Sequence, residues 1–177
     1  SNILWDSPTF IMSPHTFKRE VIATRNWEKC SALVFDVDYG VPSLQNALQA
    51  LQGYMGVLYT TKSHLKEKSG KVCERFRVII PFDEPITDLE TFYRIHNGIY
   101  QFIFDSKVDK CISVATARYR MGGKDSVSHF LAGWKMLSPK MIFEKCEKEH
   151  WGYLSKTQKK NVDTWQEIGR ASCRERV

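Results

Sequence analysis

The alternation of apolar and polar residues along the chain predicts a mixture of strands and helices. Apolar, β-branched and aromatic residues dominate 31–37, and this run ends abruptly at Asp36, Asp38 and Gly40. Such a run is typical of a buried strand whose last residues reach solvent. Ser43 then suits the N-cap of a helix with one apolar face, which predicts the order strand, turn, helix.

The next segments extend this pattern into a sheet. Residues 54–60 form a second apolar run, so the chain reads as a β-α-β unit, which favours parallel pairing of its two strands. Residues 72–81 predict a third strand with alternating side chains, after a polar, glycine-containing loop at 65–71. A loop flanked by two strands in this way is typical of a hairpin.

The second half of the chain is predicted to be mainly helical. A capping-box pattern opens a helix over 87–104, a strand is expected at 114–121, and Ser138 with the proline after it begins another helix. We interpret 136–166 as a helical extension or a linker to a missing domain. Residues 167–177 look like an in-frame translation of a sequencing-library adapter without a helical or strand period, and we expect them to be a non-native tail.

Composition narrows the class of protein. The 177 residues are 42% hydrophobic and 26% charged, which is typical of a globular protein with one main core, and the net charge of +6 is compatible with a polyanionic partner. No apolar run reaches the length of a membrane span and no segment has the order of a secretory signal, so we expect a cytoplasmic protein with no membrane partner. The five cysteines are widely spaced and indicate neither a disulfide framework nor a zinc motif.

Asp36 and Asp38 are the first candidates for chemistry. Because side chains alternate along a strand, both carboxylates can point to the same face. Two hard oxygen ligands on one face suggest a site for a divalent cation such as Mg²⁺ or Mn²⁺. The alternative is that the two aspartates merely end a strand and start a turn.

Further polar residues fall at the ends of predicted elements. In chain order the whole set is Asp36 and Asp38, Ser63 and His64, Arg75 and Arg77, and Asp109 followed by Arg118 and Arg120. If the sheet gathers these ends, three carboxylates, a histidine and several guanidinium groups would share one site. That inventory suits phosphoryl transfer with two metal ions, because the carboxylates bind the ions and arginine donates in pairs to phosphate.

Each of these residues also has a simpler interpretation. His64 could be a loop histidine without a role, and Arg75 and Arg77 could form the solvated side of a half-buried strand. Asp109 taken alone would be a surface aspartate. The order of the features along the chain, more than any single one, favours the functional interpretation.

Five stretches together resemble a known family. They are Phe-Asp-Val-Asp at 35–38, Tyr-Thr-Thr-Lys-Ser-His at 59–64, Glu-Arg-Phe-Arg-Val-Ile-Ile-Pro at 74–81, Val-Asp at 108–109, and Ala-Arg-Tyr-Arg-Met-Gly-Gly-Lys at 117–124. Their order and spacing resemble the archaeo-eukaryotic primase superfamily, in particular the primase-polymerase domains of phages and plasmids. The similarity spans residues 34–124.

The resemblance implies roles for individual residues. The catalytic metal ligands would be Asp36, Asp38 and Asp109. The nucleotide-binding residues would be Ser63, His64, Arg75 and Arg77, with His64 contacting the phosphates of the incoming nucleotide. Asp105 fits the apolar-apolar-Asp pattern of the third carboxylate as well as Asp109 does, and Arg120 is followed by Met-Gly-Gly where relatives commonly have a Pro-Gly turn.

The resemblance also implies a fold and a reaction. The fold would be α+β (mixed α/β), an RRM-like sheet with helices plus a second small α/β lobe, with the active site in the cleft between them. Residues 1–135 would be the primase-polymerase catalytic domain, incomplete at its N-terminus. The reaction would be template-directed attack of a 3′-hydroxyl on a nucleoside triphosphate, assisted by Mg²⁺ or Mn²⁺.

The expected partners follow from that reaction. They are a single-stranded DNA template, nucleoside triphosphates and a helicase domain or protein. Two alternatives remain open: a non-catalytic replication-initiator or single-stranded-DNA-binding module of the same fold, and a metal-dependent nuclease that uses the same acids.

Overall fold

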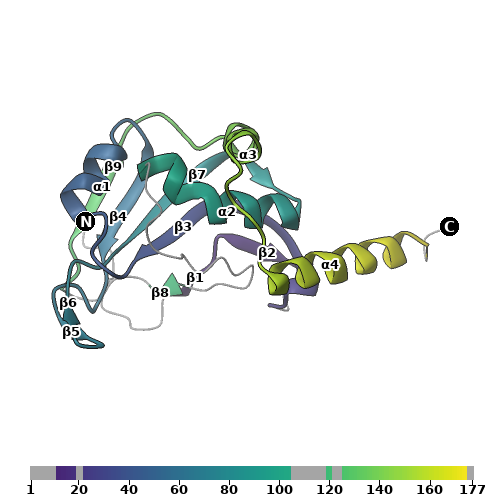
Figure 1. Cartoon of the computed structure of the whole chain (residues 1–177), viewed down its shortest axis with the longest axis horizontal. Helices are drawn as coiled ribbons and strands as arrows, with labels where there is room; N and C mark the ends of the chain where they lie inside the picture. The colour runs from purple at the N-terminus through teal and green to yellow at the C-terminus, as the bar shows by residue number, and fades with distance from the viewer. Residues whose placement is uncertain (1–10, 19–21, 105–118, 121–124, 175–177) are drawn as a thin grey trace.

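The computed structural model describes residues 11–18, 22–104, 119–120 and 125–174, which form a mixed α+β fold (Figure 1). The strands are β1 (Ile11–Met12), β2 (His15–Phe17), β3 (Trp27–Val37), β4 (Met55–Thr60), β5 (Glu67–Lys68), β6 (Lys71–Val72), β7 (Phe76–Ile86), β8 (Tyr119–Arg120) and β9 (Ser128–Ala132). The α-helices are α1 (Leu44–Ala50), α2 (Leu89–Phe104), α3 (Pro139–Lys148) and α4 (Lys156–Arg174), and a short 3₁₀ helix, η2 (Thr24–Asn26), precedes β3.

The central element is a five-stranded antiparallel sheet in the order β2-β3-β7-β4-β9. The hairpin predicted from the second and third apolar runs is confirmed, since β4 and β7 are antiparallel neighbours. The predicted parallel pairing of β3 and β4 is wrong, because β7 lies between them and pairs with both. The crossover through α1 therefore joins two strands of the same direction that are one strand apart.

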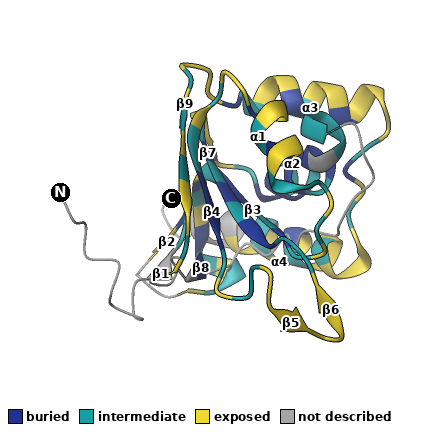
Figure 2. Cartoon of the chain, turned by 90° about the vertical axis from the view of Figure 1, so that its left-hand side faces the viewer, coloured by how far each residue is buried: buried dark blue, intermediate teal, exposed yellow. Residues whose placement is uncertain are grey.

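The helices α1, α2 and α3 all lie on one side of this sheet (Figure 2). Along β3, Leu33, Phe35 and Val37 are buried and belong to the same apolar cluster as Phe92 and Ile95 of α2. Burial of a large apolar side chain contributes about 1.5–3 kcal/mol, so this shared face supplies much of the stability of the fold. Alternation along β3 turns Asp36 to the opposite face of the sheet.

Local capping signals in the sequence work as expected at the helix starts. The Ser43 hydroxyl accepts a hydrogen bond of 3.2 Å from the backbone N–H of Asn46, as an N-cap does for α1. At α2 the Asp88 carboxylate accepts from the N–H of Thr91 at 2.7 Å, so the cap lies one residue after the start of the predicted capping box.

Two features of the sheet differ from the sequence expectation. The strand predicted to end at Pro81 continues as β7 to Ile86, with a register shift against β3 between Cys30 and Ala32. Proline is tolerated there because β4 pairs only with the first part of β7, up to Ile79, so no ladder bond to β4 is lost at Pro81. The edge strand β9 was not predicted, since its short sequence carries little apolar alternation.

The C-terminal segment packs on the same body as the rest. Leu137, Ile142 and Val162 belong to the main apolar cluster, so a boundary after residue 135 divides a single core. The Trp165 indole N–H donates to the backbone oxygen of Trp27 at 2.9 Å. Helix α4 continues to Arg174, through residues 167–174, for which the sequence predicts no helical or strand period.

In the part of the chain that the structure describes, no helix combines the length and the apolar character that crossing a membrane requires.

Candidate functional site

The candidate site lies where β3, β7 and β4 present one row of polar side chains. Asp36 of β3 is the register partner of Arg77 of β7, and Arg77 is in turn the partner of Tyr59 of β4. Register partners on adjacent strands share a face, so these three side chains stand side by side. This face is the one opposite to Phe35 and Val37, which pack under the helices.

The row is tied together by the Arg77 guanidinium. Its Nε and Nη2 donate to the two carboxylate oxygens of Asp36, the second at 3.0 Å, and its Nη1 donates to the Tyr59 hydroxyl at 3.1 Å. The guanidinium also stacks 4.8 Å from the ring centroid of Tyr119 in β8. A forked pair of this kind fixes the orientation of the carboxylate as well as its charge.

Electrostatics support a charged Arg77 at this position. Burial alone would lower the pKa of its guanidinium, but the hydrogen bonds and negative charge of Asp36 outweigh burial and raise it. Burial raises the pKa of the Tyr59 phenol, against the lowering effect of Arg77. Tyr59 is therefore a neutral hydroxyl that accepts from Arg77 at ordinary pH.

Asp38 is held differently from Asp36. Its carboxylate pairs with the Lys68 ammonium of β5 at 3.3 Å, and the two side chains are 43% and 50% exposed. An ion pair this exposed is worth about 0–1 kcal/mol. Asp38 can therefore exchange its cation at low cost.

Arg75 is buried and directed at the backbone. Only 2% exposed, it donates from Nε to the carbonyl of Asp38 at 3.0 Å and from Nη1 and Nη2 to carbonyls of the loop that follows β4. Those loop acceptors are the carbonyls of Ser63 at 2.7 Å, Lys66 at 2.7 Å, Lys71 at 2.8 Å and Lys68 at 3.5 Å. The guanidinium thus fastens the turn after β3 to this loop, and its donors are engaged within the protein.

His64 is oriented through Arg75 as well. Its Nδ1 lies 3.0 Å from the backbone nitrogen and 3.1 Å from the backbone oxygen of Arg75, so the main chain of Arg75 fixes the orientation of the ring in either tautomer. These contacts leave Nε2 as the ring nitrogen available to a ligand. Ser63 contributes its carbonyl to Arg75, and its hydroxyl lies 3.4 Å from the hydroxyl of Thr61.

The structure thus brings together most of the residues that the sequence singled out. Asp36 contacts Arg77 directly, whereas Asp38, Ser63 and His64 are linked through Arg75. Asp109, Asp105 and Arg118 lie outside the described residues. Arg120 is described only through its backbone, which pairs with Ile11 in β1.

Sequence reasoning assigned no role to three residues of this site. They are Tyr59, Tyr119 and Lys68. Tyr59 stood in a quoted motif, and its place opposite Arg77 follows once the register of β4 and β7 is known. Glu74, in the same motif as Arg75, has a structural part, since its carboxylate accepts from the N–H of Leu44 at 2.7 Å at the start of α1.

The site offers part of a ligand set for a divalent cation. Within the described ranges no three His, Cys, Asp or Glu side chains gather as a metal-binding group. Asp36 and Asp38 supply oxygen ligands of the kind that Mg²⁺ and Mn²⁺ prefer, and both carboxylates are partly exposed. Both carboxylates have the oxygen ligands that such an ion needs, and the ion would compete with Arg77 for Asp36 and with Lys68 for Asp38.

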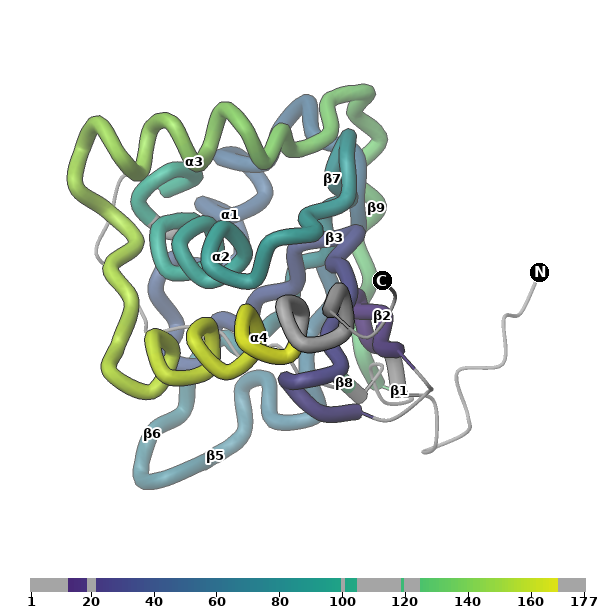
Figure 3. The backbone as a smooth tube through the Cα atoms, turned by 90° about the vertical axis from the view of Figure 1, so that its right-hand side faces the viewer, coloured from purple at the N-terminus to yellow at the C-terminus, as the bar shows by residue number. Residues whose placement is uncertain are grey.

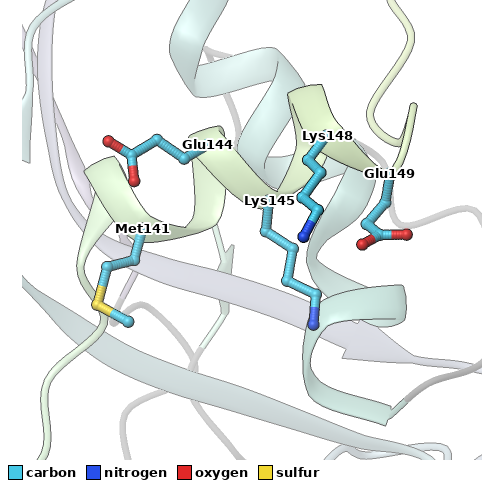
Figure 4. A pocket seen from close by; sticks show the side chains of 5 residues that line it. All are labelled: Met141, Glu144, Lys145, Lys148 and Glu149. Atoms are coloured by element: carbon cyan, nitrogen blue, oxygen red, sulfur yellow. The ribbon is translucent and has the colours of Figure 1, made fainter.

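A separate groove of about 300 Å³ lies on α3 (Figure 4). It is lined by Met141, Glu144, Lys145, Lys148 and Glu149. Charges of both signs alternate along this single helix, and the lining includes neither a buried polar group nor a nucleophile. We assign no chemistry to this groove.

Comparisons with known proteins returned nothing. No protein-family model, no curated protein and no solved structure matches the chain.

Proposed function

We propose that the chain is a template-directed nucleotidyltransferase, a DNA primase or polymerase domain of a phage or plasmid replication protein. The observation that carries the proposal is the grouping of Asp36, Asp38, His64 and Arg77 around the adjoining ends of β3 and β7. The order of the motifs along the sequence singles out the same residues. Strand register and the Arg75 hydrogen bonds give a physical reason for their proximity.

The sheet connectivity supports the RRM-like part of this proposal. The chain runs β3-α1-β4-β7-α2, with β7 inserted between β3 and β4 and the helices on one face. That arrangement leaves the other face of the sheet for the polar row of Asp36, Arg77 and Tyr59. A second small lobe and a cleft between lobes belong to the proposal.

Each residue has a distinct part in the proposed mechanism. Asp36 and Asp38, with Asp109, would hold Mg²⁺ or Mn²⁺, which supplies neutralisation of phosphate charge when bound. Arg77 fixes the orientation of the Asp36 carboxylate through its fork. His64, whose Nδ1 contacts the Arg75 main chain, directs Nε2 to a phosphate oxygen of the incoming nucleoside triphosphate.

Arg75 takes a positioning role in this mechanism in place of the phosphate contact expected from the sequence. Its donors hold the Asp38 turn and the loop that carries Ser63 and His64 in one arrangement. Preorganisation of this kind matters because small displacements of catalytic groups cost large factors in rate.

The test is nucleotide incorporation on a primed and an unprimed single-stranded template, with ribo- and deoxyribonucleotides and with Mg²⁺ or Mn²⁺. Replacing both acids, Asp36→Asn with Asp38→Asn, should lower incorporation by at least about 100-fold, because the metal supplies several kcal/mol of charge stabilisation. The matched control, Asp83→Asn with Glu84→Gln, changes two exposed acids of β7 and should leave the rate within about twofold. Undiminished incorporation by the Asp36/Asp38 variant would refute the proposal.

One observation favours the second candidate, a non-catalytic single-stranded-DNA-binding module. Both carboxylates already have protein cations as partners, Arg77 for Asp36 and Lys68 for Asp38. Such a module needs no metal, so DNA binding that is unchanged by EDTA, together with no incorporation, would support it. Degradation of the labelled strand in the same assay would instead indicate the nuclease.

A further inference from the structure

The loop between β4 and β7 forms a hairpin arm, which we define as residues 62–72. It contains the short antiparallel pair β5 and β6, joined by a turn in which Ser69 and Gly70 have positive φ angles of 56° and 75°. Figure 2 shows both strands exposed and extending below the body of the molecule, and Figure 3 shows the same projection from the other side. The arm therefore offers its side chains to a partner.

The arm is anchored firmly despite its exposure. The buried Arg75 guanidinium donates to three backbone carbonyls of the arm, those of Ser63, Lys66 and Lys71, each within 2.8 Å. It also binds the carbonyl of Asp38, so the arm is fixed to the end of β3. A buried cation satisfied by converging carbonyls is costly to move, which keeps the arm in one place.

The arm has a strong positive charge. Its sequence contains four lysines and a single glutamate, and all five side chains are exposed. They are Lys62, Lys66, Glu67, Lys68 and Lys71. The buried charge of Arg75 at the base adds to the same field. A rigid surface with this excess of ammonium groups attracts a polyanion.

An aromatic ring lies beside one of these lysines, Lys71. Tyr39, in the turn after β3, is 61% exposed, and the Lys71 ammonium donates to its carbonyl at 2.8 Å. The same ammonium lies 6.0 Å from the centroid of the Tyr39 ring. An exposed ring next to an ammonium group, on a surface with further lysines, is the combination that accommodates a stacked base and its neighbouring phosphates.

We propose that the hairpin arm and Tyr39 form a binding site for single-stranded nucleic acid. The ammonium groups of Lys66, Lys68 and Lys71 contact the backbone phosphates, and a base stacks on the Tyr39 ring. The inference rests on the proposed function only in assigning the bound strand as the template. Because Lys68 pairs with Asp38, the strand reaches the candidate site directly from the arm.

Single strands are preferred over other polyanions for a structural reason. A duplex hides the faces of its bases, and an anionic membrane or an acidic peptide offers no stacked ring in register with its charges. A partner that uses both the lysines and Tyr39 must present an accessible base next to phosphate.

The test is fluorescence anisotropy of a labelled 20-nucleotide oligothymidylate, in EDTA and without nucleoside triphosphates. The triple variant Lys66→Gln, Lys68→Gln and Lys71→Gln should weaken binding at least 10-fold and reduce the slope of log affinity against log salt by about 2, because about 0.7 counterions are released per single-strand phosphate contact. The matched control replaces three exposed lysines of α3, Lys140→Gln, Lys145→Gln and Lys148→Gln, and should change affinity less than threefold.

Tyr39 is tested separately in the same assay. Tyr39→Ala should weaken binding about fivefold or more with an unchanged salt slope, whereas Tyr39→Phe should bind like the original chain. Competition with a duplex of the same length, with heparin and with phosphatidylserine vesicles should be weaker than with the single strand.

The outcomes are decisive for the arm. Equal affinity of the arm variant and the α3 control, or no effect of Tyr39→Ala, would overturn the inference. Since the assay contains neither metal nor nucleotide, a chain that binds through the arm and incorporates nothing would refute only the proposed reaction. If the original chain incorporates nucleotides and the arm variant binds the single strand as tightly as the original chain, only the inference about the arm is refuted.

Discussion

The two ends of β3 are built from different kinds of polar group. At the start, the buried Trp27 donates its indole N–H to His15 Nδ1 at 3.0 Å, and aromatic rings of Phe92 and Trp165 pack around it, each with a centroid 5.9 Å away. At the other end, Asp36 and Asp38 carry charge and reach solvent.

The two ends of β3 are therefore suited to different tasks: the start stabilises the fold, and the end can exchange ligands. Uncharged groups buried among rings gain from packing and lose little by desolvation, so the start of β3 is suited to holding the fold. The exposed ion pair of Asp38 with Lys68 can exchange partners at small cost, so the end of β3 is suited to binding. The predictions below test this contrast.

The largest effect is expected from truncation at the start of the strand. Trp27→Ala should lower the free energy of unfolding by about 3–5 kcal/mol, because it leaves a cavity and removes the donor to His15. Urea denaturation followed by far-UV circular dichroism measures this change. Trp134→Ala, at an 86% exposed tryptophan, is the control and should change stability by less than about 0.5 kcal/mol. Equal losses in the two variants would contradict the contrast.

A smaller loss of stability is expected from the anchor of the hairpin arm. Arg75→Met should lower the free energy of unfolding by about 3 kcal/mol, since it leaves buried carbonyls without donors. Trypsin should then cleave the arm faster, at Lys66, Lys68 or Lys71, because the arm loses its attachment. Arg25→Met, at an exposed arginine, should alter neither readout. Unchanged trypsin resistance of the Arg75 variant would show that the arm is held by other contacts.

The start of β3 should also respond to acid. Burial lowers the pKa of His15 and of His96 from 6.5 to about 4, with the charge of His96 lowering that of His15 further. Between pH 6.5 and pH 4 the two histidines bind protons in the unfolded chain but stay neutral in the folded chain. The free energy of unfolding therefore falls as pH drops from about 6.5 to about 4. The loss should be about 2–3 kcal/mol for each histidine.

Urea titrations at several pH values between 4 and 7 measure this dependence. His96→Gln keeps a donor for the carbonyl of Val34, which His96 Nε2 now reaches at 3.1 Å, and should flatten the dependence. His150→Asn is the control, because His150 is exposed and has a positive φ of 54° that asparagine tolerates. A pH dependence that survives His96→Gln together with His15→Gln would assign acid sensitivity elsewhere.

The smallest effect concerns the exchangeable cation at the end of β3. Lys68→Met removes the ammonium that pairs with Asp38 and should strengthen Mn²⁺ binding by up to about fivefold, the factor equivalent to a surface ion pair. Isothermal titration calorimetry measures the change. Lys66→Met removes the same charge from the same arm without that pairing and should strengthen binding less. Equal effects of the two variants would indicate only the general field of the arm.

The extent of sequence prediction can be judged at particular residues. Ser43 as a cap, the strand that ends between Asp36 and Asp38 and the helix α2 all follow from local patterns, and the structure contains them. These features depend on residues within a few positions of each other, so capping and alternation suffice to predict them.

The order of strands in the sheet was predicted only in part. The hairpin of β4 with β7 follows from consecutive apolar runs, whereas the pairing of β7 with β3, the continuation of β7 past Pro81 and the edge strand β9 depend on contacts between distant segments. Residues 167–174 give another example, because α4 extends through a stretch without an apolar period of its own.

By itself, the sequence determined which residues carry charge at the end of β3, and only the tertiary structure decided what each of them does. Arg75 and Arg77 are two positions apart and alike in sequence, yet one binds backbone carbonyls and the other a carboxylate. The physical reason is the environment. Arg77 has Asp36 as its register partner across the sheet, whereas Arg75 lies just before β7, where the loop folds its carbonyls around the guanidinium.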